Sequence, residues 1–430
     1  MLTKPALSYA SGSSDVPLLG ETIGANFERT VARFGDREAL VDCPSHRRWT
    51  YSELDVEVDE VALGLMARGV EQGDRVGIWA PNCAEWVLVQ YATAKIGAIL
   101  VNVNPAYRSH ELRYVVQQSG MSVLISAVRY KSSDYTPMID EVRAHCPNLR
   151  DVVLLGEQSW RDLVHAGSLA DHVALDERMA TLSFDDPINI QFTSGTTGFP
   201  KGATLSHHNI LNNGFFVGEL LAYTERDRVC LPVPFYHCFG MVMGNLGATS
   251  HGACMVIPAE SFDPAATLWA VAEERCTSLY GVPTMFIAEL GLADFATYDL
   301  SSLRAGIMAG SPCPVEVMKR VVTEMNMDEV TIMYGMTETS PVSTMTRRIT
   351  STGHGEPAMI PVRRLVRSKL AKSGWPSSAM NIVGTPYSEV QRSSATARSV
   401  ASGSNAGAGT TMHAPCVVQP RLPITIPKQW

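Results

Sequence analysis

The segment "INIQFTSGTTGFPKG", Ile188–Gly202, decides the fold class. Its first residues alternate apolar and polar side chains, which predicts a strand. The strand enters a loop of glycines, hydroxyl residues and one lysine, and a helical pattern with Ser206 as N-cap follows. Such a loop can turn backbone N–H groups inward and add hydroxyl and ammonium donors, so it suits a polyphosphate. A serine- and glycine-rich hairpin or linker is the alternative, and the strand, the lysine and the following helix argue against it.

Two better-known nucleotide-binding motifs do not fit this loop. A P-loop would carry its second glycine five residues after Gly195, where this chain has Pro200. The first strand–helix unit of the chain does not open with a GxGxxG sequence either. The sequence therefore excludes the P-loop NTPase and Rossmann readings.

Helical and strand patterns alternate along most of the chain, with short turns between them. Residues 22–34 predict a helix and residues 38–42 a strand, and a second helix ends at Ala67 after an N-cap at Thr50 or Ser52. This alternation predicts an α/β fold with largely parallel sheets. By contrast, the stretch 159–186 is polar and weakly patterned.

Composition excludes several classes of protein. The chain of 430 residues has 45% apolar and 18% charged residues, which is typical of a soluble enzyme with two or three domains. Trp86–Val103 and Gly240–Ala259 are the most apolar stretches, but Lys95 and His251 interrupt them, so we expect buried core rather than membrane spans. Nine scattered cysteines and the lack of an HExxH sequence argue against a disulfide framework and a zinc site. We expect a cytoplasmic protein without a secretory signal.

Charge divides the chain near residue 347. The segment 347–430 carries eleven Lys or Arg and two Asp or Glu, although the whole chain has a net charge of −8. It is also rich in Ser, Ala, Gly and Thr without helical or strand periodicity. We therefore expect a flexible N-terminus over 1–19, an incomplete large domain over 20–346, and a basic, disordered tail over 347–430. A shifted reading frame would explain the tail, and a genuine basic tail that binds RNA or acidic lipid is the weaker alternative.

Several motifs together resemble the adenylate-forming superfamily of acyl-CoA synthetases, firefly-type luciferases and peptide-synthetase adenylation domains. Their order and spacing over residues 20–346 are most similar to AMP-forming fatty acyl-CoA synthetases. The motifs are "GDRVGIWAPNCAEW", "GAILVNVNPAYRSHEL", "TSGTTGFPKG", "PVPFYHCFG" (Pro232–Gly240), "AGSPCP" (Ala309–Pro314) and "YGMTETS" (Tyr334–Ser340).

This resemblance implies the fold and the reaction. The fold would be the large N-terminal domain of the superfamily, with layered α/β subdomains. The enzyme would join a fatty acid to ATP, giving acyl-AMP and pyrophosphate, and then transfer the acyl group to CoA, with Mg²⁺ as cofactor. Fatty acid, ATP and CoA are thus the expected partners, without nucleic acid or a membrane-spanning segment, and a peripheral membrane contact is compatible with this reading.

The resemblance also implies roles for individual residues. Glu338 would bind Mg²⁺, Thr337 would contact the α-phosphate, and Tyr334 would stack on adenine. His237 would lie beside the reacting carboxylate and gate the acyl tunnel. Six residues would hold the β- and γ-phosphates: Thr193, Ser194, Gly195, Thr196, Thr197 and Lys201. Three would form a wall of the nucleotide site: Gly310, Ser311 and Pro312.

Two further features of this region concern packing. Cys238 and Cys313 stand near the candidate site, and we expect them to be core residues rather than nucleophiles. Gly240, Gly244 and Gly247 either leave space for an acyl tunnel or allow close helix packing, and the sequence does not choose between the two.

The resemblance ends just after Thr346. Beyond it we find no aspartate for the ribose hydroxyls and no recognisable context for a lid lysine. We therefore expect impaired or absent acyl-CoA formation by this chain. Transfer of the acyl group to a carrier protein, and nucleotide binding without catalysis, are the alternative functions.

Overall fold

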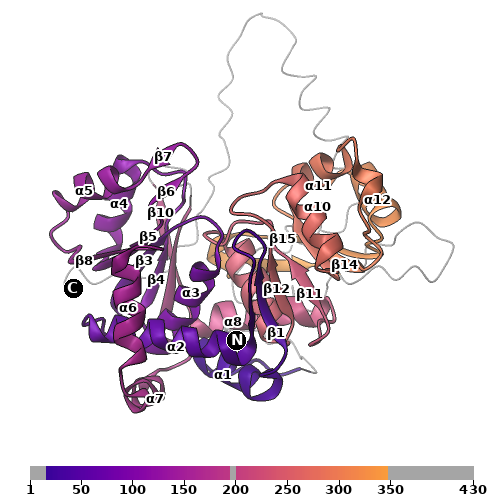
Figure 1. Cartoon of the computed structure of the whole chain (residues 1–430). Helices are drawn as coiled ribbons and strands as arrows, with labels where there is room; N and C mark the ends of the chain where they lie inside the picture. Colours follow the sequence, from indigo (N-terminus) through magenta and orange to yellow (C-terminus); the bar gives the residue numbers. More distant parts are fainter. Residues whose placement is uncertain (1–15, 194–199, 347–430) are drawn as a thin grey trace, which may run out of the picture. The chain divides into compact units, whose positions relative to one another are not determined.

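The structure, a computed structural model, describes residues 16–193 and 200–346, all within one compact unit (Figure 1). Several predictions fall outside these ranges. They concern most of the flexible N-terminus, the basic tail over 347–430, and four residues of the phosphate loop: Ser194, Gly195, Thr196 and Thr197.

A six-stranded sheet carries at one edge the hairpin of strands β9 and β10, which flanks the predicted phosphate loop; we call it the phosphate hairpin after that prediction. Its order is β10-β9-β4-β3-β5-β8, and every neighbouring pair is parallel except β9 and β10. The strands are β3 (Arg75–Trp79), β4 (Ile99–Asn102), β5 (Val123–Ser126), β8 (Asp151–Leu154), β9 (Pro187–Thr193) and β10 (Lys201–Ser206). A separate short ribbon joins β6 (Arg129–Tyr130) to β7 (Ser133–Asp134).

An eight-stranded sheet has the order β16-β15-β14-β13-β11-β12-β1-β2. Only the two edge pairs, β1–β2 and β15–β16, are antiparallel. The strands are β1 (Glu38–Asp42), β2 (Arg47–Thr50), β11 (Arg228–Cys230), β12 (Cys254–Ile257), β13 (Ser278–Gly281), β14 (Ala305–Met308), β15 (Glu329–Gly335) and β16 (Val342–Met345). The α/β prediction with largely parallel sheets is confirmed.

Helices connect the strands and cover the sheets (Figure 1). In the first part of the chain they are α1 (Ile23–Phe34), α2 (Tyr51–Ala67), α3 (Ala84–Ile96), α4 (Ser109–Ser119), α5 (Thr136–Arg143), α6 (Gln158–Ser168) and α7 (His172–Thr181). After the hairpin come α8 (His207–Leu220), the π-helix η1 (Phe239–Leu246), α9 (Gly247–Thr249), α10 (Pro264–Glu273), α11 (Pro283–Leu290), α12 (Val315–Glu324) and two short 3₁₀ turns, η2 (Phe295–Thr297) and η3 (Thr337–Thr339).

Local signals fix the start and end of several helices. Thr50, rather than Ser52, is the N-cap of α2, because its hydroxyl accepts from the Glu53 N–H and the Glu53 carboxylate accepts from the Thr50 N–H. Ser206 caps α8, as predicted. Gly97 ends α3 with a φ of 71°, a left-handed conformation that favours glycine.

The polar stretch 159–186, which showed no clear pattern, contains most of α6 and all of α7. The reason lies in how α6 packs on α2. A Cβ on Gly167 would lie 1.8 Å from the Glu60 carbonyl oxygen, and one on Gly64 would lie 2.2 Å from the Leu163 carbonyl oxygen. Paired glycines therefore bring the two backbones together, and α6 buries too few large apolar side chains to give a helical pattern.

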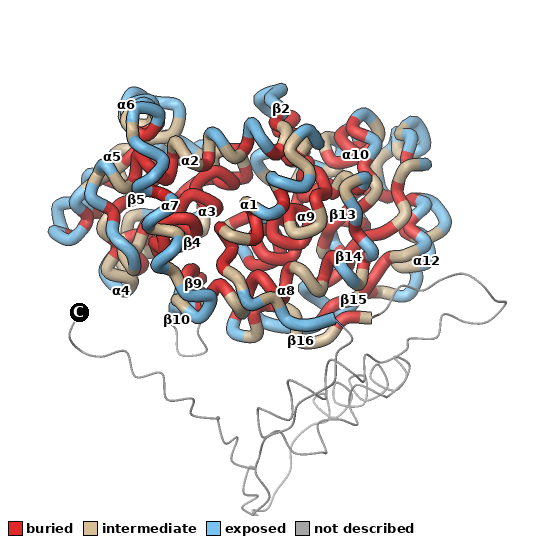
Figure 2. The backbone as a smooth tube through the Cα atoms, turned by 90° about the horizontal axis from the view of Figure 1, so that it is seen from below, coloured by how far each residue is buried: buried red, intermediate tan, exposed pale blue. Residues whose placement is uncertain are grey.

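The two most apolar stretches lie in the core, as predicted, and Figure 2 shows the buried interior of the described chain in red. No helix in residues 16–193 or 200–346 is long and apolar enough to cross a membrane. All eight cysteines in these ranges are free thiols.

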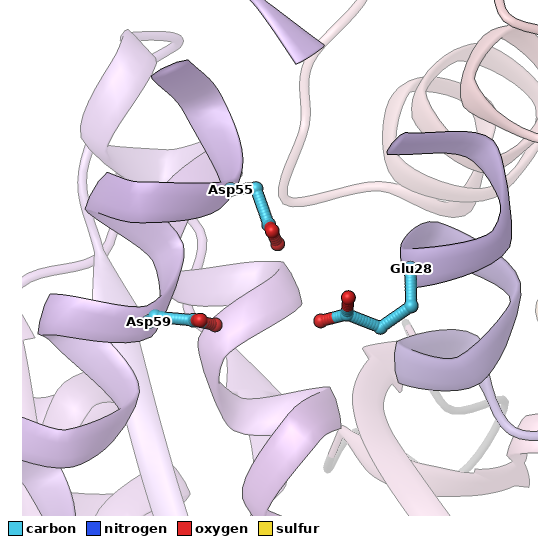
Figure 3. Close-up of side chains that lie close together, drawn as sticks. All are labelled: Glu28, Asp55 and Asp59. Atoms are coloured by element: carbon cyan, nitrogen blue, oxygen red, sulfur yellow. The ribbon is translucent and has the colours of Figure 1, made fainter. Parts of the chain in front are cut away.

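Lys95, at the end of α3, is fully buried and binds three carboxylates. Its ammonium group lies 2.6 Å from an Asp55 oxygen, 2.5 Å from an Asp59 oxygen, and in contact with Glu28. Figure 3 shows these acids converging from α1 and α2. Burial alone would lower the pKa of Lys95, but the three carboxylates outweigh it and raise that pKa. Although the acids are close enough to hold a metal ion, the lysine ammonium fills the position between them.

Glu289 on α11 is 1% exposed, and neither of its carboxylate oxygens has a hydrogen-bond partner among the described residues. Burial raises the pKa of Glu289 to about 8. Because the folded pKa lies above the unfolded one, the protein loses stability as the pH rises from about 4.5 to 8.

We expect Glu289→Leu to stabilise the protein increasingly with pH. The gain over wild type should grow by roughly 3 kcal/mol between pH 5 and pH 8, since the variant has no carboxyl group to ionise. Urea unfolding at several pH values measures this difference. Glu316→Leu, at an exposed position of α12, is the control and should show no such trend. Parallel stability profiles for wild type and Glu289→Leu would contradict the prediction.

Candidate active site

The phosphate loop joins two antiparallel strands. Thr193 ends β9, Lys201 begins β10, and the two residues are paired across the hairpin. The sequence pattern predicts a loop directly between a strand and a helix, but strand β10 lies between the loop and that helix. The segment "KGATLS" gives no strand pattern because it has only one buried side chain, Leu205. Hairpin geometry and a phosphate-binding role are therefore compatible, because Lys201 remains exposed beside the loop.

Three other candidate segments leave the same edge of the eight-stranded sheet. His237 follows β11, Gly310 follows β14, and Tyr334 lies at the end of β15. These strands are parallel, so their carboxyl ends meet at one edge, the usual place for ligands in open α/β sheets.

Glu338 links this edge to the hairpin of the other sheet. The Thr193 hydroxyl donates a hydrogen bond of 3.2 Å to a Glu338 carboxylate oxygen, although 145 positions separate the residues in sequence. Glu338 lies in η3, where the chain turns sharply, and a Cβ on Gly335 would stand 1.9 Å from the Pro341 carbonyl oxygen. The turn therefore requires glycine and presents an exposed carboxylate to the hairpin.

Thr337 contacts Cys238, the residue that follows His237 in sequence. The Thr337 hydroxyl lies 3.7 Å from the Cys238 sulfur, and both side chains are buried. Burial raises the pKa of Cys238 to about 11, and it does the same for Cys313. The expectation that both thiols are core residues is consistent with this burial, because a buried neutral thiol is a poor nucleophile.

His237 is accessible to solvent, unlike a core histidine. Its Nδ1 accepts a hydrogen bond of 3.1 Å from the Phe239 N–H. The surrounding protein removes part of the ring's hydration and lowers the pKa of His237, so the ring is neutral at pH 7. With Nδ1 as acceptor, the proton of the neutral ring lies on Nε2, which is then a hydrogen-bond donor.

The predicted nucleotide wall is exposed. Gly310, Ser311 and Pro312 all reach solvent, and Gly310 has a φ of 87°, which favours glycine. Tyr334, for which the resemblance implies adenine stacking, is 68% exposed. The structure places these residues on neighbouring strand ends, but no direct contact joins the wall to His237 among the hydrogen bonds of the described residues.

The glycines after His237 serve close packing. A Cβ on Gly240 would lie 2.4 Å from the Pro234 carbonyl oxygen, and one on Gly244 would lie 2.8 Å from the Leu231 side chain. Gly247 approaches the Gly214 carbonyl oxygen of α8 in the same way, at 3.3 Å. Close packing therefore explains all three glycines, against helix α8 at Gly247 and against the segment 231–235 at Gly240 and Gly244.

The family follows from comparison with known proteins. A protein-family model described as "AMP-binding enzyme" matches residues 27–373. The chain belongs to the AMP-binding enzyme family. In this AMP-binding enzyme, the region matched by the family model ends at residue 373, inside the basic segment 347–430.

Relatives agree with this assignment. The mitochondrial medium-chain acyl-CoA ligase ACSF2 of Danio rerio is 43% identical over 356 residues, which cover 78% of this chain and 59% of that protein. The inhibitor-bound N-terminal domain of FACL13 from Mycobacterium tuberculosis has a TM-score of 0.67 at 26% identity, covering 76% of this chain and 79% of that one. ATP-bound MatB from Rhodopseudomonas palustris has a TM-score of 0.64 at 26% identity, covering 79% of this chain and 63% of that one.

These neighbours confirm the predicted fold, the large N-terminal domain of the adenylate-forming enzymes. The chain spans 59% to 66% of the length of the first curated relatives it matches.

Proposed function

We propose that the reaction of this AMP-binding enzyme is the activation of a medium- or long-chain fatty acid with ATP to acyl-AMP, followed by transfer of the acyl group to CoA, and that acyl-CoA formation by this chain is impaired or absent. The observation that carries the proposal is the Thr193–Glu338 hydrogen bond, which brings the phosphate hairpin to the strand ends bearing His237, Thr337 and Tyr334. The name of the Danio rerio relative supports a medium acyl chain. We retain the cytoplasm as the proposed location, while that relative is named as mitochondrial.

The donor set at Glu338 fits Mg²⁺. An exposed carboxylate beside the Thr193 hydroxyl offers the hard oxygen ligands that this ion prefers. When bound, Mg²⁺ would neutralise charge on the phosphates of ATP. Lys201 would add a cation at the hairpin, and Thr337 a hydroxyl donor for the α-phosphate. The neutral His237 would donate from Nε2 to an oxygen of the acyl group.

We expect Lys201→Ala to weaken ATP binding on the order of tenfold or more while the fold stays intact, because a charge-assisted phosphate contact is lost. Calorimetry with ATP and with sulfamoyl-adenosine analogues carrying octanoyl, malonyl or benzoyl groups tests the assignment and the acyl preference together. Lys319→Ala, an exposed lysine on α12, is the matched control.

Tight binding of the octanoyl analogue by wild type, with weaker malonyl and benzoyl binding, would support the proposed function. Equal affinity for all three analogues would overturn the fatty-acid assignment. Unchanged ATP affinity in Lys201→Ala would overturn the phosphate role of Lys201.

A further inference from the structure

The segment that presents His237 leaves the eight-stranded sheet without a neighbouring strand beyond Leu231. Leu231 still donates its N–H to the Val256 carbonyl of β12. Val233 and Phe235, two and four residues further on, are fully buried. Their main-chain polar groups need partners, since each buried group left unpaired costs on the order of 1–3 kcal/mol.

One side chain from the other sheet supplies these partners. Asn82, which follows β3 and is 4% exposed, donates from Nδ2 to the Val233 carbonyl at 2.9 Å. Its Oδ1 accepts from the Phe235 N–H at 2.8 Å. The amide therefore pairs with the main chain on both sides of Pro234, as a residue of a neighbouring strand would. The Asn82 N–H also donates to the Glu260 carbonyl beyond β12, which fixes Asn82 itself.

Further hydrogen bonds hold the chain between Phe235 and the His237 ring. Asn102, at the end of β4, donates to the Tyr236 carbonyl at 3.0 Å. The His237 N–H closes a turn onto the Pro234 carbonyl at 3.2 Å, and the ring Nδ1 accepts from Phe239. The orientation of Nε2 thus depends on a turn whose entry is set by Asn82.

We infer that Asn82 is a positioning residue for His237, holding the 233–237 turn so that Nε2 faces the acyl oxygen of the adenylate. This inference rests on the proposed function. Asn82 touches no substrate in this account, and acts only through the main chain on either side of Pro234.

The test compares Asn82→Ala with Asn212→Ala. Asn212 makes the same pair of bonds, accepting from the Leu19 N–H at 2.7 Å and donating to the Leu19 carbonyl at 3.0 Å, in the segment before α1. Two readouts are used: affinity for the octanoyl sulfamoyl-adenosine analogue relative to ATP, and the NMR titration of His237 in histidine-labelled protein. The Cys238 thiol beside the ring stays neutral over the range used and does not disturb that titration.

In Asn82→Ala we expect analogue binding to weaken about tenfold, the equivalent of one directed hydrogen bond, with ATP affinity unchanged. The His237 titration should move upward toward its ordinary value, because a loosened turn returns water to the ring. Asn212→Ala should change neither readout, even if it lowers stability equally. If Asn82→Ala does not fold, Asn82→Asp keeps an oxygen that can accept from the Phe235 N–H but loses the donor to the Val233 carbonyl, and it should also weaken analogue binding relative to ATP.

A folded Asn82 variant with wild-type titration of His237 and wild-type analogue affinity would overturn the inference. If wild type binds no acyl analogue, the proposed function fails instead. The histidine titration still decides in that case whether Asn82 controls the turn.

Discussion

Glu338→Gln is expected to abolish the Mg²⁺ dependence of ATP binding and to slow acyl-AMP formation by on the order of a hundredfold or more. An amide has nearly the shape of the carboxylate but carries no negative charge, so it is a poor ligand for a hard divalent cation. The Thr193 hydroxyl can still donate to the amide oxygen, and the hairpin should keep its place.

Two measurements separate this effect from misfolding. Calorimetric titration of ATP with and without Mg²⁺ reports the metal, and fatty-acid-dependent exchange of pyrophosphate into ATP reports the first half-reaction. Glu324→Gln, which breaks a surface pair with Arg320 on α12, is the matched control and should leave both unchanged. If Glu338→Gln retains the full Mg²⁺ response, Glu338 is not the metal ligand.

Lys95→Met should lower the free energy of unfolding by about 3–5 kcal/mol, the usual cost of removing one partner from a buried ion pair. The change leaves Asp55, Asp59 and Glu28 converging on an apolar side chain. Burial already raises the pKa of Asp55 with the lysine present, and loss of the ammonium would raise it further. Acids with a raised folded pKa destabilise the protein as pH rises, so the deficit should shrink at low pH.

Urea unfolding at pH 7 and pH 5 measures this deficit. Lys319→Met removes an exposed lysine paired with Glu316 and should cost less than about 1 kcal/mol at either pH. Adding Asp55→Asn to Lys95→Met should recover part of the loss, because one unpaired charge disappears. A Lys95→Met protein as stable as the Lys319→Met control would show that the three acids are solvated without the lysine.

Local signals made much of the fold predictable from sequence. Thr50 and Ser206 are caps whose hydroxyls act within one helical turn, and the glycine at position 97 ends a helix by its own conformation. Helix α6 was not predicted because it packs on α2 through Gly167 and Gly64. It therefore lacks the stripe of large apolar side chains from which a helix is usually predicted. Strand β10 was not predicted because it lies at a sheet edge and buries only one side chain, that of Leu205.

The candidate site also has some features that the sequence predicts and others that it does not. Strand ends could be read from the sequence, so the positions of His237, Gly310 and Tyr334 at one sheet edge follow from parallel pairing. The contact between Thr193 and Glu338 could not be read, since it joins different sheets and no local pattern encodes it. Asn82 was missed for a related reason, because its partners are main-chain groups that carry no sequence signal.

In the proposed nucleotide site, the bond between Thr193 and Glu338 would also make nucleotide affinity depend on the completion of folding. The two halves of the site belong to different sheets and lie 145 positions apart in sequence, so the complete site exists only once both sheets have folded and packed together. A ligand that bridges them binds only the assembled state and shifts the folding equilibrium toward it, by about 2.7 kcal/mol at a hundred times its Kd. Cellular ATP would then act as a folding cofactor, reducing the fraction of chains that chaperones and proteases encounter unfolded.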